Sequence, residues 1–531
     1  MSASCAIRQD SSKSSVAFDN LMRPRTLRVR LVLAGVLVCA VWAEAGDRKT
    51  LASLPPEARD TATTALQWTD QYWDARAGFL WDTHLDPQPR PGVQRRHVVR
   101  DTIWYAVGLM LRDQAGDRER SLQAIAAVLK QQLDDPAQPY NGTFYRSAEE
   151  PHPPARYARL FVEYDPNWRE FVGTTLAVLL EEYSDRLPEP LRKQMESAIE
   201  RAVSSEIAEA RLRPDYSNIA LMHGFLWSWA GKRLQRPEWI RGGRQFSEEV
   251  YRLFNEHGAF EEYNSPTYYG VDLYALSLWR NYGPEPWFVK SGSDMEARLW
   301  TDIASYYHAG LKNVSGPFDR AYGMDMQSYV SLVGLWLRTR LGAEAAPFPK
   351  IGGRMVHSDD MQYASIFALL GTVIPQEALA SFRKFGTEHQ IRRELPRNRV
   401  ATAWIGKDFM LGGEATGGTR ETSGQYVPAT AYWKTPSGEA AWMALAQGPR
   451  SDARVDKQTL HVTGIGDFTF RVSAPGSAAA QVQRDAWALP GITVHVTSDA
   501  ADMTVTPADG HLDITYREAT RFELRFESNR R

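Results

Sequence analysis

Residues 258–279 read GAFEEYNSPTYYGVDLYALSLW. The first part of this stretch, up to Pro266, contains a glycine, a proline and several polar residues, as expected of a loop. In the second part Tyr269, Leu273 and Leu276 follow one another at four- and three-residue spacing, which places them on one face of an α-helix. The stretch therefore predicts a loop that leads into an amphipathic helix near Tyr268.

The same helical spacing recurs on both sides of this stretch, from about residue 55 to residue 385. The clearest helices are expected at residues 61–73, 100–111, 121–133, 171–183, 190–210, 218–229, 246–254, 268–279, 296–311 and 324–341. So many successive helices exceed a simple bundle, whereas a ring of antiparallel helical hairpins, an (α/α) toroid, holds them in one domain. Residues 134–167 contain repeated prolines and predict a long ordered loop.

After Arg399 the apolar pattern changes to short β-rich runs separated by Gly, Asp and Pro turns. These runs are residues 400–404, 441–446, 460–462, 468–472, 492–497, 512–516 and 522–526. They predict an antiparallel β-sandwich, with the boundary in residues 392–399. We therefore expect an α+β multidomain chain, with an (α/α) toroid (an incomplete helical barrel) over residues 46–391 and a β-sandwich over residues 392–531.

The N-terminal region is typical of an export signal. Four arginines between residues 23 and 30 precede an apolar run at residues 31–42, and Ala43-Glu44-Ala45 then supplies a signal-peptidase site. We expect residues 1–45 to be removed by cleavage after Ala45, with Met22 as an alternative start, and the protein to be secreted or periplasmic. The two cysteines, Cys5 and Cys39, precede this cut, so the mature protein would have no disulfide and no thiol nucleophile.

Charge and composition exclude other classes of protein. The formal net charge of -2 gives no general attraction for nucleic acid or anionic lipid. No close group of His, Asp and Glu has the spacing of metal ligands, and no phosphate-binding glycine loop precedes a helix. We therefore expect neither a metal ion nor a cofactor, no nucleic-acid partner and no stable membrane insertion after signal cleavage.

Residues 258–270, with Leu273 and Leu276, resemble polysaccharide lyases that combine an (α/α) toroid with a C-terminal β-sandwich. This group includes alginate lyases, heparinase II/III-like enzymes and chondroitin AC-type lyases. The resemblance implies that Tyr268 is the catalytic acid and that Asn167 and Trp168 line the sugar cleft. It also implies that Asn218, in a segment that contains His223, binds the substrate carboxylate.

The sequence departs from the group's pattern at the position of the base. Ile219 stands where alginate and heparinase-type enzymes often have a histidine, and Glu262 and Tyr263 stand where chondroitin AC-type enzymes have one. The base therefore stays open between Tyr268 itself and an imidazole. His223 is the first imidazole considered, and His308 and His357 are the others.

Elimination across a uronic acid needs a masked carboxylate, a base for the adjacent proton and an acid for the departing oxygen. Arg320 could bind the carboxylate through two parallel hydrogen bonds, although a salt bridge to Asp319 or Asp325 is an equal alternative. Asn218 could equally be a helix cap, and His223 a structural histidine. Glu262 and Tyr322 are also expected to contact substrate.

The sequence thus predicts a secreted polysaccharide lyase that cleaves a uronic-acid-containing glycan, such as alginate, glucuronan or a glycosaminoglycan, by β-elimination. Its partner would be an acidic polysaccharide or oligosaccharide. An inverting glycoside hydrolase on the same toroid is the first alternative, since paired acids such as Glu261 and Glu262 suit that reaction, although adjacent side chains usually diverge and these two are not expected to form the pair themselves. A non-catalytic glycan-binding protein is the second, and it is favoured if Tyr268 points into the core.

Overall fold

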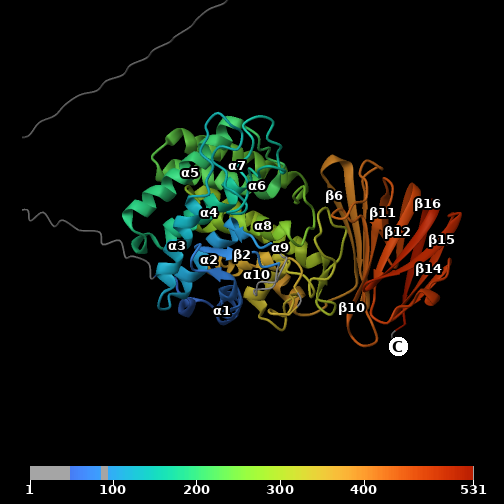
Figure 1. Cartoon of the computed structure of the whole chain (residues 1–531). Helices are drawn as coiled ribbons and strands as arrows, with labels where there is room; N and C mark the ends of the chain where they lie inside the picture. Colours follow the sequence, from blue (N-terminus) through green and yellow to red (C-terminus); the bar gives the residue numbers. More distant parts are fainter. Residues whose placement is uncertain (1–47, 85–93, 354, 530–531) are drawn as a thin grey trace, which may run out of the picture. The chain divides into compact units, whose positions relative to one another are not determined.

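The computed structural model describes residues 48–84, 94–353 and 355–529. The expected export signal, both cysteines and the cleavage site after Ala45 lie outside the described residues. The chain separates into two units at Asp47, and the helices and strands belong to the second unit, which begins at Arg48. In Figure 1 its helical part runs from blue to yellow, and its strands beyond residue 389 run from orange to red.

Twelve α-helices are present in the described part of the chain. They are α1 (Pro56–Thr69), α2 (Val99–Arg112), α3 (Asp117–Leu129), α4 (Trp168–Glu182), α5 (Glu189–Glu209), α6 (Ser217–Arg233), α7 (Pro237–His257), α8 (Tyr268–Tyr282), α9 (Pro286–Tyr306), α10 (Leu332–Leu341), α11 (Tyr363–Leu370) and α12 (Gln376–Arg383). Two small sheets accompany them. One has three strands, β1 (Trp73–Asp74), β2 (Phe79–Trp81) and β3 (His97–Val98), and the other pairs β4 (Tyr307–His308) with β5 (Asn313–Val314).

The helices form an inner ring and an outer layer. Helix α2 packs against α4, α4 against α6, α6 against α8 and α8 against α10, while α1 and α11 close the ring between α10 and α2. The outer helices α3, α5, α7 and α9 each pair with the inner helix that precedes them in the chain. Nearly every residue of α6 is buried, whereas α7 buries one stripe, as expected of a helix enclosed on all sides and one exposed on a face. The predicted (α/α) toroid is confirmed.

Helices α6 and α7 approach each other very closely. A Cβ atom on Gly224 would lie 2.2 Å from the Ser247 Oγ, and one on Gly243 would lie 2.3 Å from the Ser228 Oγ. A larger residue at either crossing would require the neighbouring serine to shift, because real Cβ atoms do not approach so closely. This packing joins the middle of α6 closely to α7.

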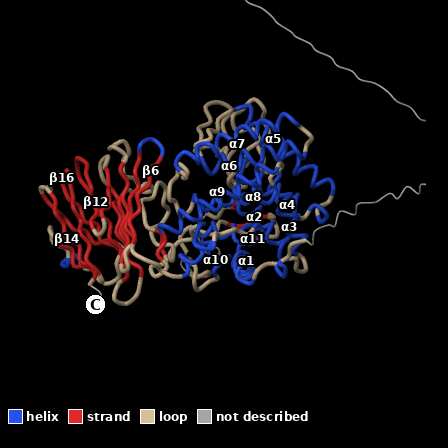
Figure 2. The backbone as a smooth tube through the Cα atoms, turned by 180° about the vertical axis from the view of Figure 1, so that it is seen from behind, coloured by secondary structure: helices blue, strands red, loops and turns tan. Residues whose placement is uncertain are grey.

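The C-terminal part is an antiparallel sheet of eleven strands folded into two layers (Figure 2). Its strands are β6 (His389–Leu395), β7 (Arg399–Ile405), β8 (Phe409–Ala415), β9 (Ala429–Lys434), β10 (Ala440–Gln447), β11 (Asp452–Asp456), β12 (Thr459–Ser473), β13 (Ala486–Leu489), β14 (Ile492–Ser498), β15 (Asp502–Ala508) and β16 (His511–Ser528). The long strands β12 and β16 pair with each other throughout, and their register shifts near Gly466.

The two long strands serve both layers of the sandwich. The first half of β12 pairs with β11 and its second half with β10, while the two halves of β16 pair with β15 and β14. Strand β11 packs across the core against β7 and β8. The predicted β-sandwich is therefore present, and β6 begins at His389, just before the boundary expected at residue 392.

Some expected helices have other bounds. Residues 324–331 are not helical, because the Asp325 carboxylate accepts hydrogen bonds from the Gln327 N–H at 3.0 Å and from the Asn313 amide at 3.0 Å, which favours a turn. The Ser331 side chain then caps α10. Residues 307–311 leave the predicted helix because Tyr307 and His308 form β4. Residues 134–167 contain no helix, as predicted, and among the described residues no helix is long and apolar enough to cross a bilayer.

Candidate active site

A cleft of about 370 Å³ lies where four inner helices begin. Arg100 of α2, Asn167 before α4, Asn218 of α6 and Tyr268 of α8 all line it from the first turn of their helices or from the cap residue. The N-terminal ends of four helices therefore converge on one cavity. Each such end carries unpaired N–H groups and a partial positive charge, so the cavity favours an anionic ligand.

A chain of polar contacts, which we call the phenol cluster, occupies one part of the cleft. It consists of Asn218, Glu262, Tyr268, Arg320 and Tyr322. The two tyrosine hydroxyl oxygens lie 2.7 Å apart, and the Arg320 Nη2 donates to the Tyr322 hydroxyl at 3.3 Å. The Arg320 Nη1 donates to the Glu262 Oε1 at 2.7 Å, and the Asn218 Nδ2 donates to the other oxygen of Glu262. The guanidinium also lies over the Tyr268 ring, 4.1 Å from its centre.

Burial sets the protonation of this cluster. Burial raises the pKa of Tyr268 well above its usual value, and the nearby Arg320 only partly opposes the rise. Tyr268 therefore keeps its proton at neutral pH and can donate it. Burial also raises the pKa of Glu262, against the opposing effects of Arg320 and of the Asn218 amide.

The Ser-Pro-x-Tyr sequence explains how Tyr268 is placed. The Ser265 hydroxyl accepts a hydrogen bond from the Tyr268 N–H at 3.0 Å, which starts α8, and donates to the Arg320 carbonyl. One serine thus ties the helix that carries Tyr268 to the loop that carries Arg320. Tyr269, the next residue, is buried on the core side of the helix and does not line the cleft.

The β-sandwich holds the loop that carries Arg320 and Tyr322. Phe318 and Val427 exchange two backbone hydrogen bonds at 3.0 and 2.9 Å, and the Ala321 N–H donates to the Gln425 carbonyl at 2.8 Å. The Asp319 carboxylate accepts from Arg399 Nη1 at 2.5 Å. The sandwich therefore takes part in the site by fixing this loop.

A second group, which we call the acidic cluster, consists of Arg100, Asp101, Asp359 and Asp360, and all of its members except Asp101 line the same cleft. The Arg100 guanidinium lies 3.8 Å from Asp359 and 3.7 Å from Asp101. Burial raises the pKa of Asp101 to about 7, although Arg100 opposes it. Burial, and next the charge of Asp359, raise the pKa of Asp360 well above its usual value.

Asp359 differs from its neighbours because it has cationic partners. Burial alone would raise its pKa, but His84 and then Arg100 hold the pKa of Asp359 below its usual value. Contacts with Asp359 and Asp82 in turn raise the pKa of His84 to about 11. His357 also lines the cleft, with its ring 4.7 Å from that of Tyr322, and burial lowers its pKa, so its ring is neutral at pH 7. His84 was not considered from the sequence, because nothing in residues 82–84 signals that it meets residues 357–359.

The predicted site residues are mostly brought together. Those that line the cleft are Asn167, Asn218, Tyr268, Arg320 and Tyr322. Glu262 lies behind them and holds Asn218 and Arg320. Trp168 does not line the cleft; its ring lies 5.3 Å below the Arg100 guanidinium.

His223 lies outside the cleft. Its Nδ1 is 3.3 Å from the Glu170 carboxylate, and its ring packs against Trp227 and Phe246. His308 also lies elsewhere, with its Nε2 3.1 Å from the Lys407 carbonyl. His223 is not placed to reach a substrate bound against Tyr268, because Asn218 lies within the regular turns of α6 and His223 is five residues further round the helix. His308 does not line the cleft either.

Two alternative hypotheses from the sequence, a capping role for Asn218 and a salt bridge of Arg320 to Asp319 or Asp325, were wrong. Asn218 does not cap its helix, since α6 begins at Ser217 and Tyr216 occupies the cap position. Arg320 pairs with Glu262 and not with Asp319 or Asp325, because Asp319 already binds Arg399.

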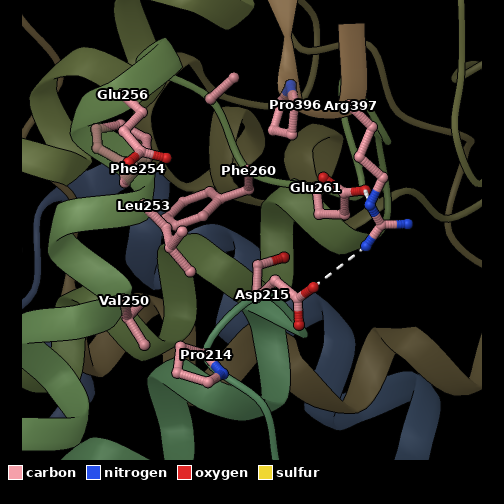
Figure 3. Close-up of a pocket in the computed structure, with 12 residues that line it drawn as sticks. Pro214, Asp215, Val250, Leu253, Phe254, Glu256, Phe260, Glu261, Pro396 and Arg397 are labelled. Carbon is pink, nitrogen blue, oxygen red and sulfur yellow. Dashed lines mark hydrogen bonds and ion pairs between the residues drawn. The ribbon is translucent and has the colours of Figure 1, made fainter. Parts of the chain in front are cut away.

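Glu261 and Glu262 point in different directions. Glu261 lines a separate pocket beside α7, where its carboxylate lies 3.3 Å from the Arg397 guanidinium, and Phe260 forms part of the apolar wall (Figure 3). Arg397 also pairs with Asp215 across this pocket at 3.2 Å. The two adjacent glutamates therefore cannot form the acid pair of a glycosidase.

Two family models match the sequence. One, described as "Domain of unknown function (DUF8769)", matches residues 59–372, and another, described as "Domain of unknown function (DUF8770)", matches residues 389–525. The search of curated proteins found no match.

Solved structures of similar fold include three carbohydrate-active enzymes. A heparinase III has 11% identity and a TM-score of 0.43, with 90% of this chain and 86% of that chain covered. A heparan sulfate lyase mutant from Pedobacter heparinus has 10% identity and a TM-score of 0.33, with 90% and 84% covered. The endoglucanase CelQ from Clostridium thermocellum has 8% identity and a TM-score of 0.28, with 88% and 93% covered.

Proposed function

The chain belongs to the family described as a domain of unknown function (DUF8769), and from the geometry of its cleft we propose that it is a polysaccharide lyase. The substrate is a uronic-acid-containing glycan, of the alginate, glucuronan or glycosaminoglycan type, and the reaction is β-elimination. The observation that carries this proposal is the continuous set of contacts in the phenol cluster, which combines an amide, a guanidinium and two phenols at one cleft.

The amide and the guanidinium are spaced for a carboxylate. Asn218 and Arg320 already donate to the two oxygens of Glu262, and both side chains also line the cleft. A uronate bound beside Glu262 would accept hydrogen bonds from their remaining N–H groups. Masking its charge makes the hydrogen on the adjacent carbon more acidic and stabilises the negative charge that develops when that hydrogen leaves.

The two phenols divide the proton transfers between them. We assign the role of base to Tyr322, because the Arg320 Nη2 donates to its oxygen at 3.3 Å and is placed to stabilise negative charge there. It removes the proton from the carbon next to the carboxylate, the electron pair forms the new carbon–carbon double bond, and the glycosidic bond at the next carbon breaks. Tyr268 protonates the departing oxygen. A proton then passes from Tyr322 to Tyr268 along their 2.7 Å contact and restores the site.

The converging helix ends support an acidic glycan. The first turns of α2, α4, α6 and α8 face the cleft, and each adds a partial positive charge. The carboxylates of the acidic cluster oppose this positive charge, so the uronate is best accommodated beside the phenol cluster.

A hydrolase is the second candidate because of the acidic cluster. The pKa of Asp360 is raised well above its usual value and that of Asp359 is lowered, and an inverting glycosidase needs one protonated and one ionised carboxyl. In that case the two aspartates, and not Glu261 and Glu262, would be the acid and the base.

A screen of uronate polysaccharides separates the two reactions. Elimination places a double bond next to the carboxylate, so ultraviolet absorbance rises in step with new reducing ends. Hydrolysis gives new reducing ends without that absorbance, and a protein that only binds glycans gives neither. Reducing ends without absorbance on every cleaved substrate would overturn the lyase proposal.

We also propose export, with residues 1–45 removed, from the arginine-rich start, the apolar run and the Ala-Glu-Ala site. The mature chain would then consist of the helical domain from residue 46 and the sandwich domain from about residue 392. Sequencing the N-terminus of the protein recovered from the periplasm or the medium tests this, and an intact Met1 would contradict it.

A further inference from the structure

Three side chains of metal-ligand type meet beside the cleft, and two of them line it. They are His84, in the loop after β2, His357, and Asp359 in the short helix Ser358–Gln362. One ligand atom from each side chain lies within 4.8 Å of the others. This group departs from the expectation that no metal ion is bound, which rested on ligand spacing, because more than two hundred residues separate His84 from the other two.

A second carboxylate orients His84 as in many metal sites. The Asp82 carboxylate lies 2.9 Å from the His84 Nδ1 and also accepts the His84 backbone N–H at 2.9 Å. Metal-binding histidines usually donate one ring N–H to a carboxylate or carbonyl in this way, which leaves the other nitrogen for the ion. Here the other nitrogen, Nε2, faces Asp359 at 3.1 Å.

The remaining ligand atoms lack hydrogen-bond partners among the described residues. The Oδ1 of Asp359 is buried and unpartnered, because its 3.1 Å contact with His84 does not have hydrogen-bond alignment. Two ligands bound at about 2.0–2.2 Å to one tetrahedral ion are about 3.3–3.6 Å apart, slightly more than this separation. No hydrogen bond to another described residue holds the His357 ring, so it can rotate to complete the set.

The two segments that carry these ligands are also joined by a hydrogen bond that involves none of the three ligand side chains. The Ser358 hydroxyl donates to the Thr83 carbonyl at 2.8 Å, and both residues are buried. Each is the immediate neighbour of a ligand residue. The ligands therefore come from two segments that remain adjacent whether or not an ion is present.

We propose that His84, His357 and Asp359 bind one Zn²⁺ ion, with Asp82 as a positioning residue for His84. Two imidazoles and one carboxylate suit zinc, whereas Ca²⁺ requires six to eight oxygen ligands. Three protein ligands leave an open coordination position. His357 and Asp359 line the cleft, so the open position is available to an oxygen of a bound glycan.

The role of the ion rests on the proposed function. His357 lies 4.7 Å from the Tyr322 ring, so an ion on His357 is next to the phenol cluster but not in contact with its acid. We expect the ion to anchor a carboxylate or sulfate oxygen of the glycan. Its removal should therefore raise KM at least tenfold and leave kcat nearly unchanged.

Calorimetric titration of the full chain, dialysed against chelator and free of glycan, tests the site directly. We expect one Zn²⁺ per chain for the wild type, and at least tenfold weaker binding for His357→Ala and for Asp359→Asn. Asp82→Asn should weaken binding by about 10- to 100-fold, since it leaves all three ligands in place. His495→Ala, a change at an exposed histidine of β14, is the matched control and should bind like the wild type.

Cobalt binding provides a measurement that needs no variant. Co²⁺ added to the wild-type protein should give a visible absorption band that one equivalent of Zn²⁺ removes. If the wild type does not bind stoichiometric Zn²⁺, the proposed metal site is wrong, and the group is explained by an ion pair of His84 with Asp82 and Asp359. Unchanged binding in both ligand variants would place the ion elsewhere and overturn it too. Because no glycan is present, these results do not depend on whether the protein is a lyase.

Discussion

The phenol cluster and the acidic cluster share one cleft but differ in how their polar groups are satisfied. In the phenol cluster each member contacts the next, and neutral donors and one guanidinium surround a single carboxylate. In the acidic cluster three carboxyls surround one guanidinium, and two of them, Asp101 and Asp360, have raised pKa values. The first arrangement suits elimination and the second suits hydrolysis. Variants that disable one cluster and spare the other therefore decide between the two reactions.

The largest effect is expected for Tyr268→Phe. The change keeps the ring and its stacking under Arg320 and removes only the hydroxyl that would protonate the leaving oxygen. Loss of a general acid costs roughly 10²- to 10⁴-fold in rate, so kcat for formation of the unsaturated uronate should fall by about this factor. Steady-state kinetics on a confirmed substrate provide the measurement.

Tyr269→Phe is the matched control for this change. It removes the same atom from the adjacent residue, whose ring is buried away from the cleft. Its kcat should stay within about threefold of the wild-type value. Full activity of Tyr268→Phe with loss of activity in Tyr269→Phe would mean that the assignment is off by one residue.

The next largest effect is expected for Asn218→Ala. This change removes one of the two groups that mask the uronate charge but leaves Glu262 paired with Arg320. Loss of one such donor costs roughly 10²- to 10³-fold, and the loss should appear mainly in kcat because the charge grows in the transition state. Asn255→Ala on the exposed face of α7 is the control. An Asn218→Ala enzyme that loses only affinity would show that the amide binds substrate without assisting the chemistry.

The fold was largely predictable because helix periodicity and strand patterning are local signals. Inner helices such as α6 and α8 carry apolar residues at helical spacing, and the change of pattern after Arg399 marked the sandwich. The failure at residues 324–331 has a physical cause. That segment has helical spacing, but the Asp325 side chain binds nearby N–H groups and favours a turn.

The site was predictable only where its residues are close in sequence. Ser265, Pro266 and Tyr268 form one local element, so their arrangement followed from the motif. The pairing of Arg320 with Glu262 could not be predicted in this way. Carboxylates closer in sequence, such as Asp319, were available, and only the tertiary structure shows that Asp319 pairs with Arg399 instead. The acidic cluster also joins segments far apart in the chain, and no spacing rule brings Asp101 to Asp360.

A pH-dependent effect on stability is expected from Asp101. Burial raises its pKa to about 7 in the folded chain, compared with about 3.9 when unfolded. Stability from this group is present below pH 4 and is lost as the pH rises through about 7, because the unfolded chain gives up its proton first. Asp101→Asn should remove this loss, which amounts to at most about 1.4 kcal/mol per pH unit.

Thermal unfolding midpoints measured between pH 4 and pH 8 check this expectation. The midpoint of Asp101→Asn should fall less steeply with pH than that of the wild type. Asp502→Asn, at an exposed position of β15, should follow the wild-type curve. Parallel curves for Asp101→Asn and the wild type would mean that Arg100 keeps Asp101 ionised in the folded protein.

The smallest effect is expected for Asp360→Asn, and it discriminates most sharply between the two clusters. Burial and the charge of Asp359 raise the pKa of Asp360 well above its usual value, which favours its uncharged form, and an asparagine reproduces the shape of that form with little disturbance of folding. In a lyase that uses the phenol cluster, kcat for the unsaturated product should change less than about tenfold. In a hydrolase, Asp360 would be the general acid, and its loss would lower reducing-end release by roughly 10²- to 10⁴-fold. Following absorbance and reducing ends in the same reaction gives both values, with Asp215→Asn as the control at the rim of the neighbouring pocket.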